Sequence, residues 1–297
     1  MHYLITGATG FIGSALVESL LADGHIITVL SREPSKAHHQ FSGRVAVITL
    51  DQVYTLNEID AVVNLAGAPI VDKRWSEARK RLLLESRIDF TAKLIELLHS
   101  ADLKPAVFLS GSAIGYYGNH DDENLTEESE VHEGFTHSLC RDWELAAMQA
   151  ETLLGSRVCL LRTGVVLGKG GGAVAKMLLP FKLGLGGPIG SGKQWMSWIH
   201  LDDEVGAIRF LLANNHLQGA FNLTAPTPAN NATFAKTLGA VLHRPACLPM
   251  PAFVMTLALG EASELLLKGQ RVLPKRLNEA GYVFKYPSLQ EALQAAV

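Results

Sequence analysis

The sequence predicts an α/β protein with a Rossmann-type, doubly wound parallel sheet and a smaller, mostly helical C-terminal lobe. Three observations point to it. Short apolar runs alternate with helix-length amphipathic stretches through the first half of the chain. Those runs are aliphatic or β-branched nearly throughout, as strands covered on both faces are. A glycine-rich turn joins the first run to the first helical stretch. Strand–helix alternation implies right-handed crossovers and therefore parallel strands.

The expected elements follow in chain order. Strands are predicted at residues 3–6, 26–30, 45–50, 61–65, 106–110 and 158–161. Residues 12–23 form an amphipathic helix that Gly24 would end, since glycine readily adopts the left-handed conformation found after helices. Residues 168–192 are rich in glycine and lack periodicity, which predicts a loop-rich segment. A helix at 201–212, a late strand at 221–223 and mostly helical structure from residue 230 complete the chain.

The alternation of apolar runs and amphipathic stretches stops near residue 165 and a glycine-rich segment follows, which indicates two closely joined parts. We expect a nucleotide-binding Rossmann domain of residues 1–165 plus about 200–226. The remainder, about 166–199 and 227–297, would form the substrate or C-terminal lobe. No internal repeat or low-complexity linker separates them.

Composition excludes several classes of function. Hydrophobic residues make up 48% of the 297 residues and charged residues 19%, with a net charge of −3. This balance excludes disorder and gives no sign of a nucleic-acid partner. Three scattered cysteines, a start without a basic region and the lack of a long apolar run predict a cytoplasmic protein with no membrane partner. No cysteine or histidine spacing suits a metal, and His132 and His137 lie five residues apart, which would not place them on one helical face.

The glycine-rich turn after the first strand predicts a dinucleotide site. Glycines there permit tight backbone angles and let main-chain N–H groups approach a pyrophosphate at a helix N-terminus. The alternative is a glycine-rich turn without a ligand. The candidate contacts within the segment are Gly7, Thr9, Gly10, Phe11, Ile12 and Gly13.

The end of the second strand predicts which dinucleotide is preferred. A carboxylate at this position would bind the 2′-hydroxyl of NAD, whereas an arginine receives the 2′-phosphate of NADP. The chain has Ser31 and Arg32 there, and no carboxylate before Glu33. We therefore expect NADP(H), the alternative being an exposed arginine without a ligand.

These residues resemble the short-chain dehydrogenase/reductase superfamily in its extended, epimerase-like branch. The resemblance adds Leu65, Ala66 and Gly67 after the fourth strand to the expected cofactor contacts. A closer similarity, to the subgroup of epimerase family proteins with its own small C-terminal domain, is carried by residues 67–75, 112–118 and 269–277. It spans nearly the whole chain.

The resemblance implies a Tyr-x-x-x-Lys pair and a serine, but the pair is missing. No tyrosine of this chain has a lysine four residues later, and Thr136 and Cys140 stand at the matching positions. Ser112 remains at the serine position. Tyr116 or Tyr117, on the loop that follows, would be the substitute acid, tuned by His200 or Lys73; the alternative is that both tyrosines are packing residues.

Basic groups indicate where a substrate anion could bind. The candidates are Lys73, Arg162, His200 and Arg271, with surface charge or structural hydrogen bonding as the alternative. Arg271 and Lys275 would share a helical face if a helix ran through Pro274. The segment 187–193 resembles a phosphate-binding loop but has Gln194 where Ser or Thr would hold magnesium. It is instead predicted to be a substrate lid gated by Trp195 and Trp198, or a plain loop.

The leading hypothesis is an atypical NADP(H)-dependent oxidoreductase, or a protein resembling a sugar-nucleotide epimerase, acting on a small polar substrate that is anionic or nucleotide-linked. The alternative is a non-catalytic NADP-binding redox sensor or scaffold, suggested by the missing acid–base pair. The resemblance also makes a homodimer an option, although no apolar patch in the sequence identifies an interface.

Overall fold

A sheet of seven parallel strands forms the centre of the computed structural model, which describes all 297 residues. Its spatial order is β11-β7-β5-β4-β1-β2-β3. This confirms the predicted Rossmann-type fold, because the chain starts in the middle of the sheet and builds outward in both directions. The strands are β1 (His2–Thr6), β2 (Ile26–Leu30), β3 (Ala46–Ile48), β4 (Ala61–Asn64), β5 (Val107–Ala113), β7 (Arg157–Thr163) and β11 (Gly219–Leu223).

The reversal of strand order lies at β1, which has β2 on one side and β4 on the other. In the register of these pairs, Thr6 lies beside Leu30 and beside Asn64. The loops that follow these three residues therefore leave the same edge of the sheet. In parallel α/β sheets a crevice opens at such a reversal, outside the carboxyl ends of the strands.

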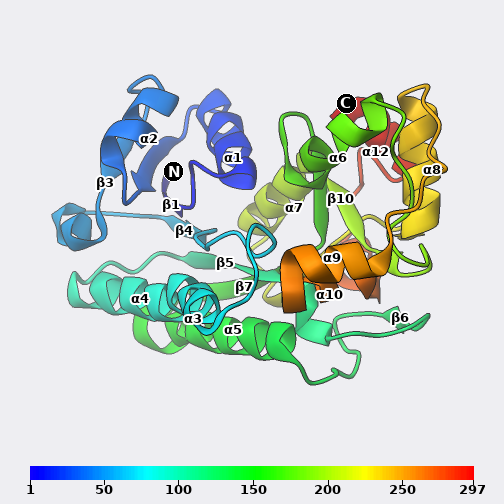
Figure 1. Ribbon diagram of the computed structural model, residues 1–297. Coiled ribbons are helices and arrows are strands. Elements are labelled where there is room, and N and C mark those ends of the chain that lie inside the picture. The colour runs from blue at the N-terminus through cyan, green and yellow to red at the C-terminus, as the bar shows by residue number, and fades with distance from the viewer.

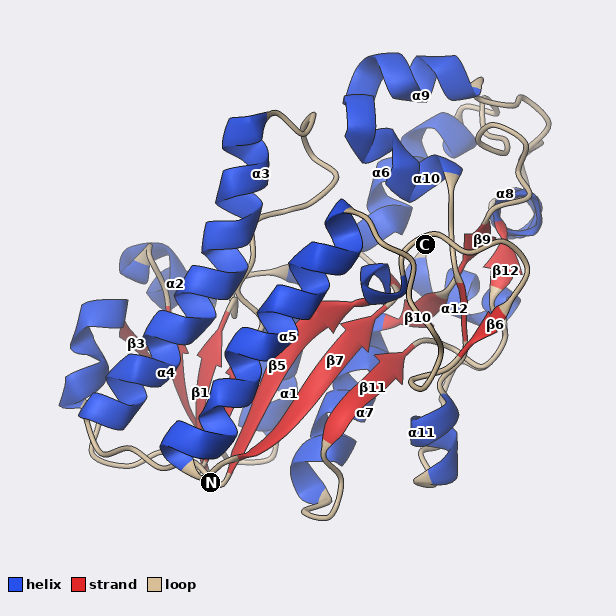
Figure 2. Cartoon of the chain, turned by 90° about the horizontal axis from the view of Figure 1, so that it is seen from below, coloured by secondary structure: helices blue, strands red, loops and turns tan.

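Helices cover both faces of this sheet (Figure 2). On one face, α1 (Phe11–Ala22) and α7 (Leu201–Ala213) contribute to a core that includes Ile5 and Val63. On the other, α4 (Phe90–Ser100) and α5 (Phe135–Leu154) cover Leu4 and Val62. Alternate residues of each strand thus enter different cores, which is why the strands are aliphatic throughout. The helices α2 (Pro34–Gln40) and α3 (Glu77–Leu84), with the short turns η1 (Leu50–Thr55), η2 (Glu85–Asp89) and η3 (Ile114–Tyr117), complete this part.

The remaining elements form a smaller lobe beyond the carboxyl edge of the sheet (Figure 1). Its own core surrounds Phe181, Trp198 and Phe234. Three two-stranded pairs support it: β8 (Val165–Gly168) with β10 (Trp198–His200), β9 (Trp195–Met196) with β12 (Ala229–Asn230), and β6 (Asn124–Leu125) with β13 (Arg271–Val272). Its helical elements are α6 (Gly172–Lys182), α8 (Asn231–Val241), α9 (Ala252–Leu259), η4 (Gly260–Ser263), α10 (Glu264–Leu267) and α12 (Leu289–Ala296). The helix α11 (Lys275–Glu279) packs instead against β11, with Leu277 in the core of the sheet.

Three expectations for this lobe are wrong. The segment 168–192 is not all loop, because α6 lies within it and buries Val174 and Phe181 in the lobe core. Trp198 cannot gate a lid, since it is fully buried in β10. Arg271 lies in β13, whereas Lys275 is the first residue of α11, so the two share no helical face.

The length and hydropathy of the helices bear on membrane insertion. None of them combines the length and the apolar composition that crossing a bilayer requires.

Candidate functional site

The turn between β1 and α1 has the backbone geometry that anion binding needs. Gly7 has a φ of +65°, in the left-handed region that glycine tolerates. A Cβ on Gly13 would lie 2.3 Å from the Gly7 carbonyl oxygen, so no larger residue fits there. Gly10 begins α1 without a side-chain cap, which leaves N–H groups of the first helical turn available to a ligand.

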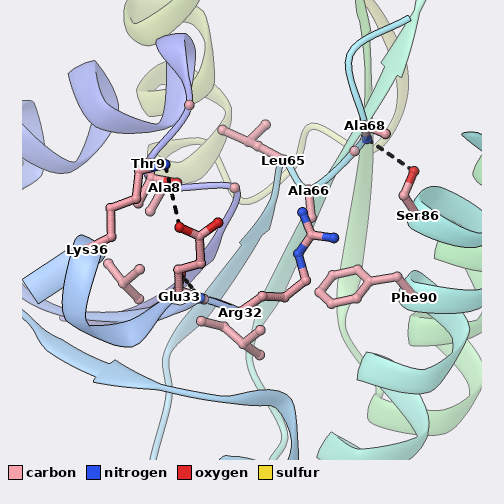
Figure 3. A pocket seen from close by; sticks show the side chains of 16 residues that line it. Ala8, Thr9, Arg32, Glu33, Lys36, Leu65, Ala66, Ala68, Ser86 and Phe90 are labelled. Carbon is pink, nitrogen blue, oxygen red and sulfur yellow. Dashed lines mark hydrogen bonds and ion pairs between the residues drawn. The ribbon is translucent and has the colours of Figure 1, made fainter. Parts of the chain in front are cut away.

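A pocket opens directly in front of this turn (Figure 3). Its walls come from the three loops that follow β1, β2 and β4, together with η2 and the start of α4. Of the eleven predicted cofactor contacts, those that line it are Gly7, Thr9, Gly10, Ser31, Arg32, Leu65, Ala66 and Gly67. The lining residues that the sequence reasoning missed are Ala8, Val29, Leu30, Glu33, Lys36, Ala68, Ser86 and Phe90.

Three predicted contacts lie elsewhere in the structure. The Phe11 ring packs against glycines of the smaller lobe: a Cβ on Gly171 would lie 2.3 Å from it. Ile12 packs against the core below α1, and Gly13 supports the turn from behind. Phe11 thus joins the glycine turn to the second lobe.

One end of the pocket is positively charged. Arg32 is exposed at the end of β2 and makes no hydrogen bond or ion pair within the chain, while Ser31 Oγ accepts the Glu33 N–H at 3.1 Å. Lys36, one helical turn further, lies 3.6 Å from the Glu33 carboxylate. Figure 3 shows Arg32 and Lys36 on either side of the Glu33 carboxylate, with the Arg32 guanidinium beside Ala66 and Lys36 reaching toward Thr9. Lys36 could have been found from the sequence, because it lies in the first turn of the helix that begins at Pro34.

Beneath the carboxyl end of β5, Ser112 belongs to a buried polar network. Its hydroxyl donates to Glu144 Oε1 at 2.7 Å. Arg162 donates to both carboxylate oxygens of Glu144, from Nε at 2.8 Å and from Nη2 at 2.9 Å. Burial lowers the pKa of Arg162, but the hydrogen bonds and charge of Glu144 more than offset it, so the pKa is raised overall. The expectation that Arg162 binds a substrate anion is therefore wrong, because its charge is already paired inside the protein.

Tyr117 belongs to the same network and is fully buried. Its hydroxyl donates to Asn222 Oδ1 at 2.6 Å and accepts from Arg162 Nη1 at 3.1 Å. Burial raises the pKa of Tyr117 to about 12. A phenol that is enclosed, hydrogen-bonded and hard to ionise is a packing residue, so the structure speaks against Tyr117 as the substitute acid.

Tyr116 differs from its neighbour because its ring is only half-buried. The Arg162 guanidinium lies over that ring, 3.4 Å from its centre. His137 Nδ1 lies 2.5 Å from the Tyr116 carbonyl oxygen, which ties η3 to α5. A role of Tyr116 in proton transfer stays a prediction.

Thr136 and Cys140, which stand at the expected positions of the missing Tyr and Lys, lie against the loop after β5. A Cβ on Gly115 would be 3.2 Å from Thr136 Cβ and 3.6 Å from Cys140 Sγ. Burial raises the pKa of Cys140 to about 12, so this thiol stays neutral. Neither side chain can supply the positive charge of a lysine.

A cation does reach this region from another element, and sequence reasoning missed it. Arg87 lies in η2, a single π-helical turn of the kind often found at functional sites. Its guanidinium would be 3.0 Å from a Cβ on Gly67, and it donates to the Ala68 carbonyl oxygen at 2.9 Å. No carboxylate pairs with it, and burial lowers its pKa. A single sequence carries no signal for this residue.

The other predicted anion contacts are dispersed. Lys73 is exposed before α3 and has no partner. His200 caps α7, its Nδ1 accepting the Asp202 N–H at 3.1 Å, while its buried Nε2 has no partner and burial lowers its pKa. Arg271 lies against the Trp195 ring at 4.3 Å. No hydrogen bond or ion pair joins these three residues to one another.

The loop that carries Lys73 contacts the smaller lobe. Arg74 donates to the carbonyl oxygens of Leu257 and Ala258 at the end of α9. Lys80 lies 2.6 Å from Glu261. These contacts join the Rossmann part to the C-terminal helices.

Comparisons with known proteins agree with this geometry. Residues 3–224 match the model of the "NAD dependent epimerase/dehydratase family", and residues 250–296 match a domain of unknown function, DUF1731. The chain is 43% identical to the chloroplastic epimerase family protein SDR39U1 homolog of Arabidopsis thaliana, over 99% of this chain and 86% of that one.

Two solved structures are also similar. The crystal structure of human epimerase family protein SDR39U1 with NADPH is 39% identical, with a TM-score of 0.91 over 100% of this chain and 99% of that one. UDP-glucuronic acid 4-epimerase from Bacillus cereus superposes with a TM-score of 0.81 over 100% and 98% of the chains, but at 19% identity this likeness concerns the fold alone.

Proposed function

The chain belongs to the NAD dependent epimerase/dehydratase family, and from this premise we propose that it is an atypical NADP(H)-dependent oxidoreductase or epimerase-like enzyme. Its substrate would be a small polar molecule. The observation that carries the proposal is the pocket in which a glycine turn faces Arg32, in the loop after β2, and Lys36, in the first turn of α2.

The residues present fit NADP(H). At Gly7 and Gly13 a Cβ would collide with backbone atoms of Leu65 and Gly7, as expected for the tight turn and the close helix–strand packing of a dinucleotide-binding turn. Arg32 and Lys36 are suited to a 2′-phosphate, because a free guanidinium and an ammonium offer charge-assisted hydrogen bonds to its oxygens. The NADPH bound to the human relative supports the same choice.

A bound nicotinamide would supply or accept a hydride, and the chain's own residues would hold the substrate. Ser112 donates its proton to Glu144, so its oxygen remains free to accept a hydrogen bond from a substrate hydroxyl. The Glu144 side chain already accepts hydrogen bonds from Ser112 and from two donors of Arg162. We therefore infer that Ser112 orients the substrate, while protons come from solvent or from the substrate itself.

Arg87 would supply positive charge at the Gly67 end of the pocket. Its guanidinium lacks an acidic partner, so its field is not cancelled locally. A cation at this position stabilises an electron-rich oxygen of the ligand. This is the electrostatic part of the role that the lysine of the Tyr-x-x-x-Lys pair has in the superfamily.

A second candidate function rests on Thr136 and Cys140. Because neither can act with a phenol in proton transfer, the chain would also suit a non-catalytic NADP-binding sensor or scaffold. This candidate predicts tight cofactor binding without any transfer of hydride.

Isotope transfer separates the two. The purified chain is incubated with NADPH deuterated at C4 and a panel of carbonyl compounds, and separately with NADP⁺ and sugar nucleotides deuterated at the carbon that carries the reacting hydroxyl. Mass spectrometry follows the deuterium. The proposal predicts deuterium in at least one product, lost in S112A and retained in the exposed-serine control S100A. Tight NADPH binding with no transfer to any compound would favour the sensor.

A further inference from the structure

Arg271 is an arginine whose hydrogen-bonding capacity is unused. Its side chain makes no hydrogen bond and no ion pair with any other residue, and its Nε is buried without a partner. Guanidinium groups present five donors, and buried donors are nearly always satisfied in folded proteins. The two Nη atoms are not buried, so they can reach a ligand from outside. An unsatisfied guanidinium of this kind points to an acceptor that is not part of the chain.

The Arg271 guanidinium lies over the Trp195 indole. The Arg271 carbon Cζ lies 4.3 Å from the centre of the Trp195 ring. The indole is itself fixed, because its Nε1 donates to Asp122 Oδ1 at 2.7 Å. Stacking on an aromatic face leaves the in-plane N–H donors of an arginine open to a planar anion.

The backbone around Arg271 is also fixed. Ser197 Oγ accepts the Val272 N–H at 2.8 Å and donates to the Gln270 carbonyl oxygen at 2.8 Å, so one hydroxyl holds both neighbours of Arg271. Gln270 Nε2 donates to the Gly118 carbonyl oxygen at 2.6 Å, directly after Tyr117. A group held this way before a ligand arrives loses little entropy on binding.

We infer that Arg271 and Trp195 form an oxyanion subsite that binds the phosphoryl or carboxylate group of the substrate. This inference deepens the proposed function, on which it rests, by assigning the substrate a negatively charged group. The carboxylate of Asp122 is the acidic group that contacts Trp195. It accepts the indole N–H and lies beyond ion-pair distance of Arg271. The bound anion would therefore approach the Nη edge of the guanidinium.

The test is a calorimetric titration of the full chain at constant ionic strength, with NADPH saturating so that the glycine turn is occupied. The probes are inorganic phosphate, pyrophosphate and malonate. Variants R271Q and R271K are compared with R81Q, a control in which an exposed arginine without partners is neutralised. W195L removes the aromatic platform, whereas W195F keeps one. Thermal unfolding of each variant checks that it is folded.

The expected result is binding of at least one probe, weakened about tenfold or more in R271Q, as for loss of a charge-assisted bidentate contact. R271K should fall between, because it keeps the charge without the fork, and R81Q should match the wild type. W195L should weaken the binding and W195F should retain most of it. Preference for pyrophosphate or phosphate over malonate would identify a phosphoryl substrate, and the reverse preference a carboxylate.

Equal binding by R271Q and the wild type would overturn the inference, as would the absence of binding by all three probes up to about 10 mM. Failure of the proposed function can be told apart from failure of the Arg271 subsite, because it would appear as a lack of NADPH binding by the wild type. The difference between wild type and R271Q would then still report on the subsite, since both proteins have the same glycine turn.

Discussion

Arg162 and Glu144 form a doubly hydrogen-bonded ion pair inside the protein, joining β7 to α5. The two bonds measure 2.8 and 2.9 Å, and both side chains are buried. The pair stands directly behind Ser112, whose hydroxyl donates to the same carboxylate. Arg162, which sequence reasoning placed among the substrate contacts, thus supports Ser112 through Glu144. Ser112 is the residue expected to touch the substrate.

Removing one member of this pair should be strongly destabilising. R162M leaves a buried carboxylate without its partner, so the free energy of unfolding should fall by about 3–5 kcal/mol. Urea denaturation followed by circular dichroism measures it. The double variant E144Q/R162M should recover part of the loss because no charge stays buried, and K93M at an exposed pair should show no comparable change. A loss in R162M no larger than in K93M would contradict this prediction.

Tyr117 should prove to be structural. Y117F removes the hydroxyl that bonds Asn222 and Arg162, and should lower the free energy of unfolding by about 1–2 kcal/mol. The affinity for NADPH should be unchanged, because the phenol is fully buried. Calorimetry and denaturation together measure both effects, with Y116F as the matched variant. If Y117F abolished deuterium transfer while keeping full stability, the phenol would be catalytic after all.

Glu204 should make stability depend on pH. Its carboxyl is fully buried beside Thr163, and burial raises its pKa from the ordinary 4.5 to about 8. At pH values between 4.5 and about 8, Glu204 has lost its proton in the unfolded chain but keeps it in the folded chain. The free energy of unfolding therefore falls as pH rises through this window, by up to about 1.4 kcal/mol per pH unit. Below 4.5 both states are protonated and this contribution is fully retained.

The variant E204Q cannot ionise and should lack this dependence. Between pH 5 and 8, the free energy of unfolding of E204Q should rise relative to that of the wild type. The difference between the exposed control E96Q and the wild type should stay constant over the same range. Parallel profiles for E204Q and the wild type would show that Glu204 does not carry a raised pKa.

The sequence was sufficient for features that depend on neighbours along the chain. Aliphatic runs identified the strands of the sheet, and the glycine spacing after Thr6 identified the turn that lines the pocket. Both are local: a strand buried on two faces and a tight turn each require particular residues in a row.

Features that depend on partners far along the chain could not be predicted. The role of Arg162 is set by Glu144 on another element, and Arg87 comes next to Gly67 only through the fold of η2. The helix α6 was hidden because its flanking glycines masked the two buried positions, Val174 and Phe181, that fix it to the lobe core.

The preference of the pocket for NADP(H) is measured by the calorimetric affinities of the wild-type chain and R32Q for NADPH and NADH. We expect the wild type to bind NADPH about tenfold or more tightly than NADH, through charge-assisted contacts to the 2′-phosphate. R32Q should lose most of that preference and keep its affinity for NADH. Binding of NADH as tight as that of NADPH by the folded wild-type chain, or binding of neither, would show that the pocket is not an NADP(H) site.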